Sequence, residues 1–395
     1  MYLTPYQEKI LNGEYGWIYA KAFELIVKIG EVLGAEKLIS VNHVHVSGVS
    51  YSNIGDYGLE FIKEFYVKGG LAKVYTTVNP GCIDLSNSSR LISNMFYNKQ
   101  LEINNYLEKM GFKPTYTCIP YLHRRPVLNE HLAWGESSAV IFANSIYGAR
   151  TNREGGPLTI ASALTGYTYY HGLHLDRERV IDTVISIENI ESKYYGLIGL
   201  WIGENIENKP LIKNAVNDYS SLKILLASAA ASGDHGLIAI DKITPKKSYY
   251  MSDKIEKINI ELKDIEKYQS KTLEFDLKDS KIIGFIGCPH LDPVEFTEIY
   301  DYIVNIYSRG RCRLRNYLLI SVPYIYNELF INEINVLRRI GVEVTLGTCP
   351  IVSTISEKPD YVITNSGKAY FYLKKHKNIE VYLSTPFEII RQLCE

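Results

Sequence analysis

Three of the six cysteines of the chain stand in similar local sequences, and their thiols could together bind a metal centre. Cys118, Cys288 and Cys349 occur in TCIPY, GCPH and GTCPI, each with a proline close behind. Proline keeps the backbone before it extended, and a cysteine in such a loop is one local setting of an iron–sulfur ligand. The three are far apart in the sequence, so the alternative of three small buried apolar residues stays open.

The other three cysteines fit such a centre less well. Cys82 in NPGC also follows a predicted strand and could join the same face, whereas Cys312 in RGRCRLRN and the terminal Cys394 are interpreted as bystanders. The chain has no C-x-x-C pair, which argues against zinc ribbons and ferredoxin-type clusters. Six cysteines in 395 residues do not form a disulfide framework, so we expect free, catalytic or metal-bound thiols.

Two glycine-bearing loops could bind an anion through their backbone N–H groups. They are HVSGVSYSNIGD at residues 45–56 and TTVNPG at residues 76–81, each between a predicted strand and a helix. N–H groups and hydroxyls at such positions can meet a carboxylate or phosphate. Neither loop has the G-x-G-x-x-G or P-loop form, so no motif indicates a nucleotide and a tight turn remains the alternative.

The densest polar patch of the sequence is WGESS, at residues 134–138, followed by GARTNREGGP, at residues 148–157. Its two arginines, Arg150 and Arg153, stand before a predicted helix and suit a carboxylate or phosphate clamp. Ion pairing of Arg150 and Glu154 within the protein is the alternative interpretation.

The histidines indicate no metal motif, because no H-E-x-x-H arrangement occurs. His43 and His45 share one face of a predicted strand. We interpret most of the histidines as hydrogen-bonded packing residues.

Composition excludes several other classes of protein. Lys and Arg number 43 against 44 Asp and Glu, for a formal net charge of −1, which argues against nucleic-acid and membrane-surface binding. Apolar residues make up 46% and charged residues 22%, as in ordinary soluble globular chains. The start has no signal-peptide pattern and no stretch is apolar enough for a membrane span, so we expect a cytoplasmic protein.

The elements that would position these residues alternate between short strands and helices. Helices are predicted at residues 4–34, 59–67, 101–110, 137–147, 158–164, 179–187, 296–307 and 326–340, after Ser366, and at residues 387–394, with a capping box at Thr4 and Gln7. Strands are predicted at residues 38–46, 72–78, 115–118, 282–286, 317–322, 342–346, 361–364 and 381–383. Such alternation favours an α/β fold with mainly parallel sheets.

The chain divides into three parts on the same grounds. Residues 1–241 are expected to form two interleaved α/β modules with the substrate loops and Cys118, and residues 281–395 a third module with Cys288 and Cys349. Between them, residues 242–280 are richer in charge and shorter in apolar runs, which indicates a linker or an edge segment.

Several of these segments together resemble one known family. HVSGVSYSNIGD, TTVNPGCID, the block WGESSAVIFANSIYGARTNREGGP and the GCPH and GTCPI loops closely resemble the catalytic large subunit of the aconitase X family, over essentially the whole chain. The resemblance implies an aconitase-like fold of three α/β/α modules around a central cleft. It also implies an iron–sulfur cluster and the removal of water from a hydroxy acid.

The resemblance further implies roles for individual residues. Cys118, Cys288 and Cys349 match the ligands of a 4Fe-4S cluster, with one iron left without a thiolate; a smaller cluster is not excluded. The matching substrate contacts are Gly48, Val49, Ser50, Asn79, Pro80, Glu136, Ser137 and Lys368, and the candidates for a phosphate socket are Arg150, Arg153 and Lys368. Ordinary aconitases place two ligands in C-x-x-C, so the analogy with them does not extend to geometry.

The function implied in this way is the dehydration of (R)-5-phosphomevalonate to trans-anhydromevalonate 5-phosphate in a modified mevalonate route to isoprenoids. The alternatives are a cis-3-hydroxy-L-proline dehydratase on the same scaffold and a cluster-free protein that binds a phosphorylated metabolite. The family also implies a partner, a small swivel-domain subunit that supplies the catalytic base. We find no β-rich segment in this chain that could form the swivel, and therefore expect a heterodimer.

Overall fold

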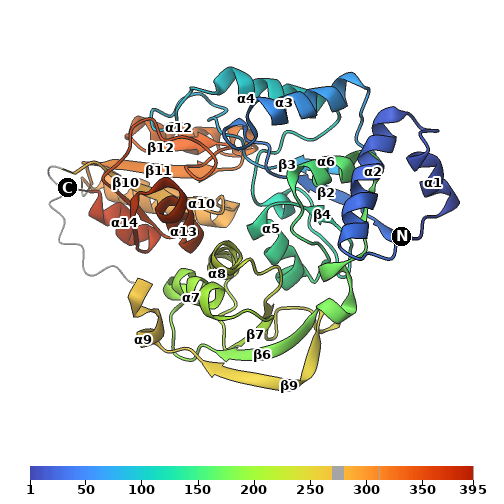
Figure 1. The fold of residues 1–395 in the computed structure, drawn as a ribbon. Coiled ribbons are helices and arrows are strands. Elements are labelled where there is room, and N and C mark those ends of the chain that lie inside the picture. Colours follow the sequence, from blue (N-terminus) through green and yellow to red (C-terminus); the bar gives the residue numbers. More distant parts are fainter. Residues whose placement is uncertain (269–279, 311, 395) are drawn as a thin grey trace.

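The computed structural model describes residues 1–268, 280–310 and 312–394, which form three lobes, each with its own sheet (Figure 1). The predicted α/β class is confirmed, because every strand pair but one in the described residues is parallel. No helix in this described part is long and apolar enough to cross a membrane.

The first lobe carries the N-terminus, at the right of Figure 1. Its helices are α1 (Pro5–Leu11), α2 (Trp17–Val32), α3 (Tyr51–Val67), α4 (Tyr97–Lys109) and α6 (Gly156–Thr165). Its strands are β1 (Leu38–Ser40), β2 (His43–Val46), β3 (Tyr75–Val78), β4 (Ala133–Trp134) and β5 (Tyr167–Tyr169). The parallel sheet has the order β3-β2-β4, and the predicted capping box at Thr4 and Gln7 is confirmed.

The second lobe holds a parallel sheet of order β8-β7-β6-β9. Its strands are β6 (Val180–Ser186), β7 (Pro210–Lys213), β8 (Ala239–Ile240) and β9 (Tyr250–Asn259). Its helices are α7 (Tyr195–Asn205), α8 (Tyr219–Gly233) and α9 (Leu262–Ile265). Helix α5 (Ser137–Phe142) is continued by a π-helix at Ala143–Tyr147, and α5 packs against α8. Together these two elements cover the buried helix predicted at residues 137–147.

The third lobe is a five-stranded parallel sheet of order β12-β11-β10-β13-β14, flanked by helices. The strands are β10 (Ile282–Ile286), β11 (Tyr317–Val322), β12 (Glu343–Leu346), β13 (Tyr361–Thr364) and β14 (Glu380–Leu383). The helices are α10 (Pro293–Ser308), α11 (Tyr326–Leu329), α12 (Ile331–Arg339), α13 (Gly367–Lys377) and α14 (Pro386–Gln392). The predicted strand–helix series is confirmed here.

Short 3-10 helices connect several of these elements, at Pro120–Leu122, Gly172–His174, Asp176–Glu178, Ser192–Tyr194, Lys246–Ser248 and Glu266–Tyr268. The predicted strand 115–118 is wrong, because that segment forms no strand and leads into the first of these turns. Of the segment 242–280, residues 250–259 form the edge strand β9, whose side chains are mostly exposed, and residues 269–279 lie outside the described part.

The predicted helix 179–187 is also wrong, because these residues form the strand β6. Its side chains alternate between half-buried and buried, with Ile181, Thr183 and Ile185 in the core. Apolar residues in adjacent pairs fit helical spacing as well as strand spacing, but β-branched side chains lose rotamers in a helix and pack well in a sheet.

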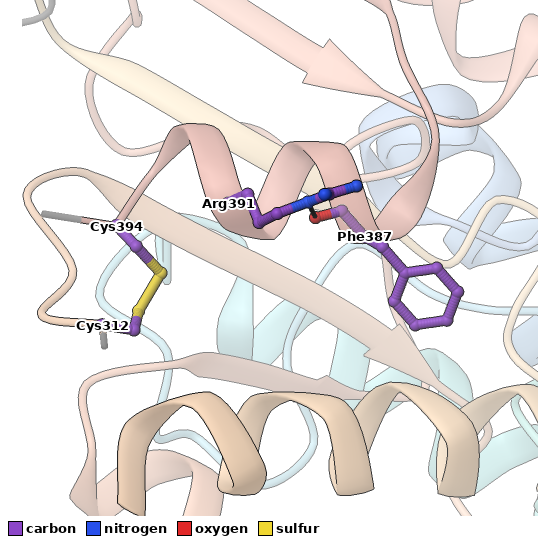
Figure 2. The surroundings of a disulfide bond; sticks show 4 residues. All are labelled: Cys312, Phe387, Arg391 and Cys394. Atoms are coloured by element: carbon purple, nitrogen blue, oxygen red, sulfur yellow. Dashed lines mark hydrogen bonds between the residues drawn. A yellow bond between two sulfur atoms is a disulfide. The ribbon is translucent and has the colours of Figure 1, made fainter. Parts of the chain in front are cut away.

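Cys312 and Cys394 lie outside the candidate site, as interpreted, but the expectation that the cysteines are free, catalytic or metal-bound is wrong for these two. They form a disulfide between residues 82 positions apart, which joins the segment before β11 to the end of α14 (Figure 2). The pairing depends on an antiparallel bridge between Leu314 and Cys394, a long-range contact that the sequence pattern does not indicate.

Candidate functional site

A cavity of about 590 Å³ lies where loops of the first and third lobes face each other. Its wall follows the carboxyl ends of the parallel strands: residues after β2, β3 and β4 on one side and residues after β10, β12 and β13 on the other. The hydroxyl of Ser50 donates a hydrogen bond across this junction to the carbonyl oxygen of Val352 at 2.8 Å. Ligands of open α/β sheets bind at this edge, where strands give way to helix N-termini.

The three cysteines of the sequence prediction all line this cavity. Cys118, Cys288 and Cys349 come from separate loops and are buried. Burial raises the pKa of Cys118 to about 12 and raises the pKa of Cys288 and of Cys349 as well, because an isolated thiolate is costly away from water. The thiols are close enough for the charge of one thiolate to raise the pKa of another.

Two glycines allow the cysteine loops to approach each other. Gly287, directly before Cys288, has φ of 113°, and a Cβ there would lie 2.3 Å from the carbonyl oxygen of Ser321. Gly347 has φ of 71°, and a Cβ there would lie 2.9 Å from the Cβ of Tyr116, in the segment that leads to Cys118. Only glycine combines this backbone conformation with this close packing.

The donor set fits an iron–sulfur cluster better than a single metal ion. Among the described residues, no three His, Cys, Asp or Glu side chains are grouped closely enough to hold one ion. The three cysteine ligands of a cluster each bind a different iron, so their sulfurs are spaced more widely than around one ion. Buried thiols with raised pKa values need a nearby positive charge to ionise, and the irons of a cluster would supply that charge.

A buried ion pair forms the polar floor of the cavity. The Nζ of Lys368, in the first turn of α13, pairs with the Oε1 of Glu136, the N-cap residue of α5, and both side chains are largely buried. Lys368 also donates to the Oγ of Ser137 at 3.3 Å. Burial would raise the pKa of Glu136, but the ammonium of Lys368 outweighs it and holds that pKa well below the ordinary value. The pair therefore stays ionised.

A chain of hydrogen bonds runs from this pair into the first lobe. Asn79 donates to the Oε2 of Glu136 at 3.0 Å, and its Oδ1 lies 3.2 Å from the Nε2 of His45. His45 and His43 both contact the Oγ1 of Thr77, each at 2.9 Å. Burial lowers the pKa of His45 to about 4, so the imidazole is neutral and holds Asn79 in place. The interpretation of these two histidines as hydrogen-bonded packing residues is confirmed.

The structure brings most of the sequence-predicted site residues into one place. Besides the cysteines, the cavity is lined by Gly48, Ser50, Asn79, Pro80, Glu136, Ser137, Arg153 and Lys368. Val49 and Arg150 do not line it: Val49 packs in the core of the first lobe. Cys82 does not join the other cysteines either, because its Sγ donates to the Oε1 of Gln100 at 3.2 Å.

The two arginines of the predicted clamp have different surroundings. The guanidinium of Arg150 is buried and binds the carboxylate of Asp176 at 2.5 Å and the carbonyl oxygen of His174 at 2.9 Å. Arg153 is partly exposed at the cavity rim and pairs with Asp234 at 2.6 Å. The placement of Arg150 favours a structural role, and that of Arg153 a role at the site.

Sequence reasoning missed one whole face of α13. Tyr372 and His376 line the cavity together with Lys368, and Lys377 follows them. A spacing of four residues puts side chains on one face of a helix, so the pattern KAYFYLKKH could have indicated it. The Nζ of Lys377 binds the carbonyl oxygen of Pro350 at 2.5 Å and that of Ser353, which fixes the loop that carries Cys349.

Three domain models of one protein family match this chain. Residues 1–177 match the family model described as aconitase X first domain, residues 178–270 the second domain and residues 282–395 the third domain. The resemblance stated from the sequence is thereby confirmed.

Individual relatives extend this match. The chain is 36% identical to the phosphomevalonate dehydratase large subunit of Thermococcus kodakarensis, over 95% of each chain. It is also 36% identical to the protein of that name from Methanocaldococcus jannaschii, over 99% of this chain and 100% of the relative. A cis-3-hydroxy-L-proline dehydratase of Hypocrea jecorina is 26% identical over 92% of this chain, which spans 63% of that relative.

The fold has a counterpart among solved structures. It matches the crystal structure of Thermococcus kodakaraensis aconitase X in its holo form with a TM-score of 0.88 and 35% identity, over 100% of both chains. The expected architecture of the family therefore holds for this chain.

Proposed function

Because this chain belongs to the aconitase X family, we propose that it is the large subunit of an iron–sulfur hydro-lyase that dehydrates (R)-5-phosphomevalonate to trans-anhydromevalonate 5-phosphate. The named relatives are dehydratases, so the reaction class is that of a hydro-lyase. The observation that carries the proposal is the convergence of Cys118, Cys288 and Cys349 with the Lys368–Glu136 pair in one cavity.

The three cysteines would hold the cluster. When bound, a cluster with one iron free of protein thiolate supplies a Lewis acid for the departing hydroxyl group, which leaves poorly at neutral pH. The cysteine loops contribute an enclosed wall that limits the access of water, since all three thiols are buried.

The cations of the chain would bind the two anionic ends of the substrate. Lys368 is buried and kept charged, because the Glu136 carboxylate raises its pKa against the opposing effect of burial. Arg153 lies at the rim, next to the N-terminus of α6 at Gly156, which offers unpaired N–H groups. Guanidinium and helix N-termini both favour phosphate, and a buried ammonium with flanking serine hydroxyls favours a carboxylate.

The catalytic base would come from the partner. Glu136 is a poor base, because its low pKa makes the carboxylate a weak proton acceptor. The relatives with this chain's length are named large subunits, which supports a second, smaller subunit. We propose a swivel domain that closes over the cavity and removes the proton α to the substrate carboxylate.

The alternative function is the dehydration of cis-3-hydroxy-L-proline, because two of the relatives are named for that reaction. The assembled, cluster-loaded enzyme should turn over (R)-5-phosphomevalonate at least a hundredfold more efficiently than cis-3-hydroxy-L-proline, measured as kcat/KM under anaerobic conditions. A preference for the amino acid would reject the proposed substrate and leave the hydro-lyase class intact. A folded protein that retains no iron after anaerobic reconstitution and still binds phosphomevalonate would favour a binding protein.

A further inference from the structure

Gln100, near the start of α4, is a polar side chain with no surface exposed to solvent. Burial of an amide is costly unless its polar atoms are paired. The partners of Gln100 lie in or next to two loops: residues 47–50, which connect β2 to α3, and residues 79–82, which follow β3. We call these the substrate loops, because the predicted substrate contacts that they contain are Gly48, Val49, Ser50, Asn79 and Pro80.

Gln100 bonds to the backbone at the end of the first substrate loop through both ends of its amide. Its Nε2 donates to the carbonyl oxygen of Val49 at 3.1 Å, and its Oε1 accepts from the backbone N–H of Tyr51 at 2.8 Å. Tyr51 is the first residue of α3, where the N–H has no helical carbonyl to pair with. The side chain of Gln100 supplies that acceptor and so fixes the backbone on either side of Ser50.

The same amide also holds the second substrate loop. Its Oε1 accepts from the backbone N–H of Cys82 at 3.3 Å and from the Sγ of Cys82 at 3.2 Å. Gly81 packs so closely that a Cβ there would lie 2.8 Å from the Cδ of Gln100. The Nε2 of Gln100 also donates to the Oδ1 of Asn104 at 2.9 Å, which fixes the direction in which the amide faces. One side chain therefore joins both substrate loops.

The loop that carries Cys349 has its own contact with the second substrate loop. The hydroxyl of Thr348, directly before Cys349, donates to the carbonyl oxygen of Gly81 at 2.7 Å. Among the described residues, Gln100 bonds only to partners in the first lobe. Loss of the Gln100 amide should therefore loosen the substrate loops while the cysteine ligands keep their contacts.

We propose that Gln100 is a positioning residue that holds the two substrate loops in the arrangement that binds the substrate. Because this role takes the loops to contact phosphomevalonate, it rests on the proposed function. Gln100 does not touch the substrate itself, since it is fully buried and does not line the cavity. Loops that are ordered before binding lose less conformational entropy when the substrate arrives. The contribution of Gln100 is therefore to substrate affinity, and not to retention of the cluster.

Gln100→Met keeps the approximate size of the side chain and removes its hydrogen-bonding groups. In the reconstituted complex with the small subunit, we expect KM for phosphomevalonate to rise roughly tenfold or more and kcat to change less than about threefold. The iron content should equal that of the wild type. A purely structural effect would lower the folded fraction, and hence the apparent kcat, without changing KM. An unchanged KM, or a loss of iron in proportion to the loss of activity, would overturn the proposal.

Leu107→Ala is the matched control on the same helix. Leu107 is also fully buried, lies about 10 Å farther along the axis of α4 and has no polar group with which to hold the loops. The cavity left by this substitution should lower the melting temperature at least as much as Gln100→Met does. We expect KM to stay within about twofold of the wild-type value. A rise in KM equal to that of Gln100→Met would overturn the proposal, because any loosening of α4 would then have the same effect.

Amide hydrogen exchange measures the loop contacts without any substrate. In Gln100→Met, the amides of Tyr51 and Cys82 should exchange roughly tenfold faster than in the wild type, whereas the amides of strand β3 keep their rates. Equal rates in the two proteins would overturn the proposal. So would a Tyr51 amide that exchanges in the wild type as fast as in an unstructured peptide, even if Gln100→Met does not fold. If the wild-type complex does not turn over phosphomevalonate, the proposed function fails, and the exchange rates still decide whether Gln100 holds the loops.

Discussion

The backbone N–H of His290 donates a hydrogen bond to the sulfur of Cys118 at 3.2 Å, across 172 positions of sequence. The carbonyl oxygen of the same residue accepts a hydrogen bond from the Nζ of Lys223 at 3.1 Å. His290 therefore links the cysteine loops of two lobes to helix α8 of the remaining lobe. This contact gives a physical reason why the cavity needs all three lobes in place.

We expect Cys118→Ser, Cys288→Ser and Cys349→Ser each to lose most of the bound iron after anaerobic reconstitution, because a hydroxyl ligates iron poorly in place of a thiolate. Iron and sulfide analysis with an absorption spectrum measures the loss. Cys312→Ser is the matched control and should keep the wild-type iron content, since Cys312 lies in the disulfide. Full iron content in all three cavity variants would contradict the assignment.

Loss of that disulfide should affect stability instead. Closing a loop between residues 82 apart stabilises a folded chain by about 4 kcal/mol in the chain-entropy view. Cys312→Ser should therefore lower the free energy of unfolding by roughly 2–4 kcal/mol in urea denaturation, and a reducing agent should do the same to the wild type. Equal stability of oxidised and reduced wild type would show that the bond is absent in solution.

Lys223→Met should destabilise the chain by about 3–5 kcal/mol, because Lys223 is buried and pairs with Glu295 and, at 3.6 Å, with Asp292. The variant leaves a buried carboxylate without its cation. Lys193→Met, which breaks an exposed pair with Glu191, should leave the free energy of unfolding nearly unchanged. Comparable costs for the two substitutions in chemical denaturation would mean that the Lys223 contacts contribute little.

Lys368→Met should lower kcat/KM for phosphomevalonate roughly ten- to a hundredfold, because it removes a charged contact from the cavity and leaves Glu136 unpaired. Lys374→Met lies on the same helix, where its Nζ contacts the Tyr370 hydroxyl, and serves as the control with near wild-type kinetics. The double variant K368M/E136Q should be less impaired than the sum of the single effects. Strict additivity would argue against a working ion pair.

Glu154 should make stability depend on pH. Burial raises the pKa of this carboxyl from 4.5 to about 7, against hydrogen bonds from Tyr169 and Thr168 that lower it. Between these values the folded chain binds more protons than the unfolded chain, so stability falls as pH rises, by up to about 3 kcal/mol. The difference in unfolding free energy between wild type and Glu154→Gln, measured from pH 4 to pH 8, should shift by this amount. If the difference in unfolding free energy did not change with pH, the pKa of the Glu154 carboxyl would not be raised by folding.

Local patterns were sufficient for much of the fold and of the site. The alternation of elements, the loops at strand ends and the cysteines before prolines are encoded in short segments, and the carboxyl-edge rule then brings them together. The helix prediction for residues 179–187 was wrong because the spacing of the paired apolar residues fits the helical period and the strand period equally well. Its β-branched residues were the better guide.

The remaining features depend on contacts between distant segments. The disulfide of Cys312, the clamp of Lys223 on His290 and the contacts of Gln100 with the substrate loops each join residues that no local pattern connects. Arg150 illustrates the same limit, because its type suits a phosphate clamp and only its buried partner Asp176 reveals a structural role.

We expect the chain alone to be inactive, because Lys368 holds Glu136 ionised with a low pKa, which makes Glu136 a poor base, and because the proposed small subunit supplies the base. Titration of the small subunit into the reconstituted chain should restore dehydratase activity and saturate at one partner per chain. Full turnover by the chain alone would contradict this expectation.

Proton NMR of (R)-5-phosphomevalonate, incubated anaerobically with the reconstituted chain and its small partner, tests the proposed reaction directly. We expect a new vinylic proton signal as water is lost between the α-carbon and the tertiary carbon, and no such signal when the same complex carries Cys349→Ser. A vinylic signal of equal rate with the Cys349→Ser complex, or none with the iron-loaded wild type, would contradict it.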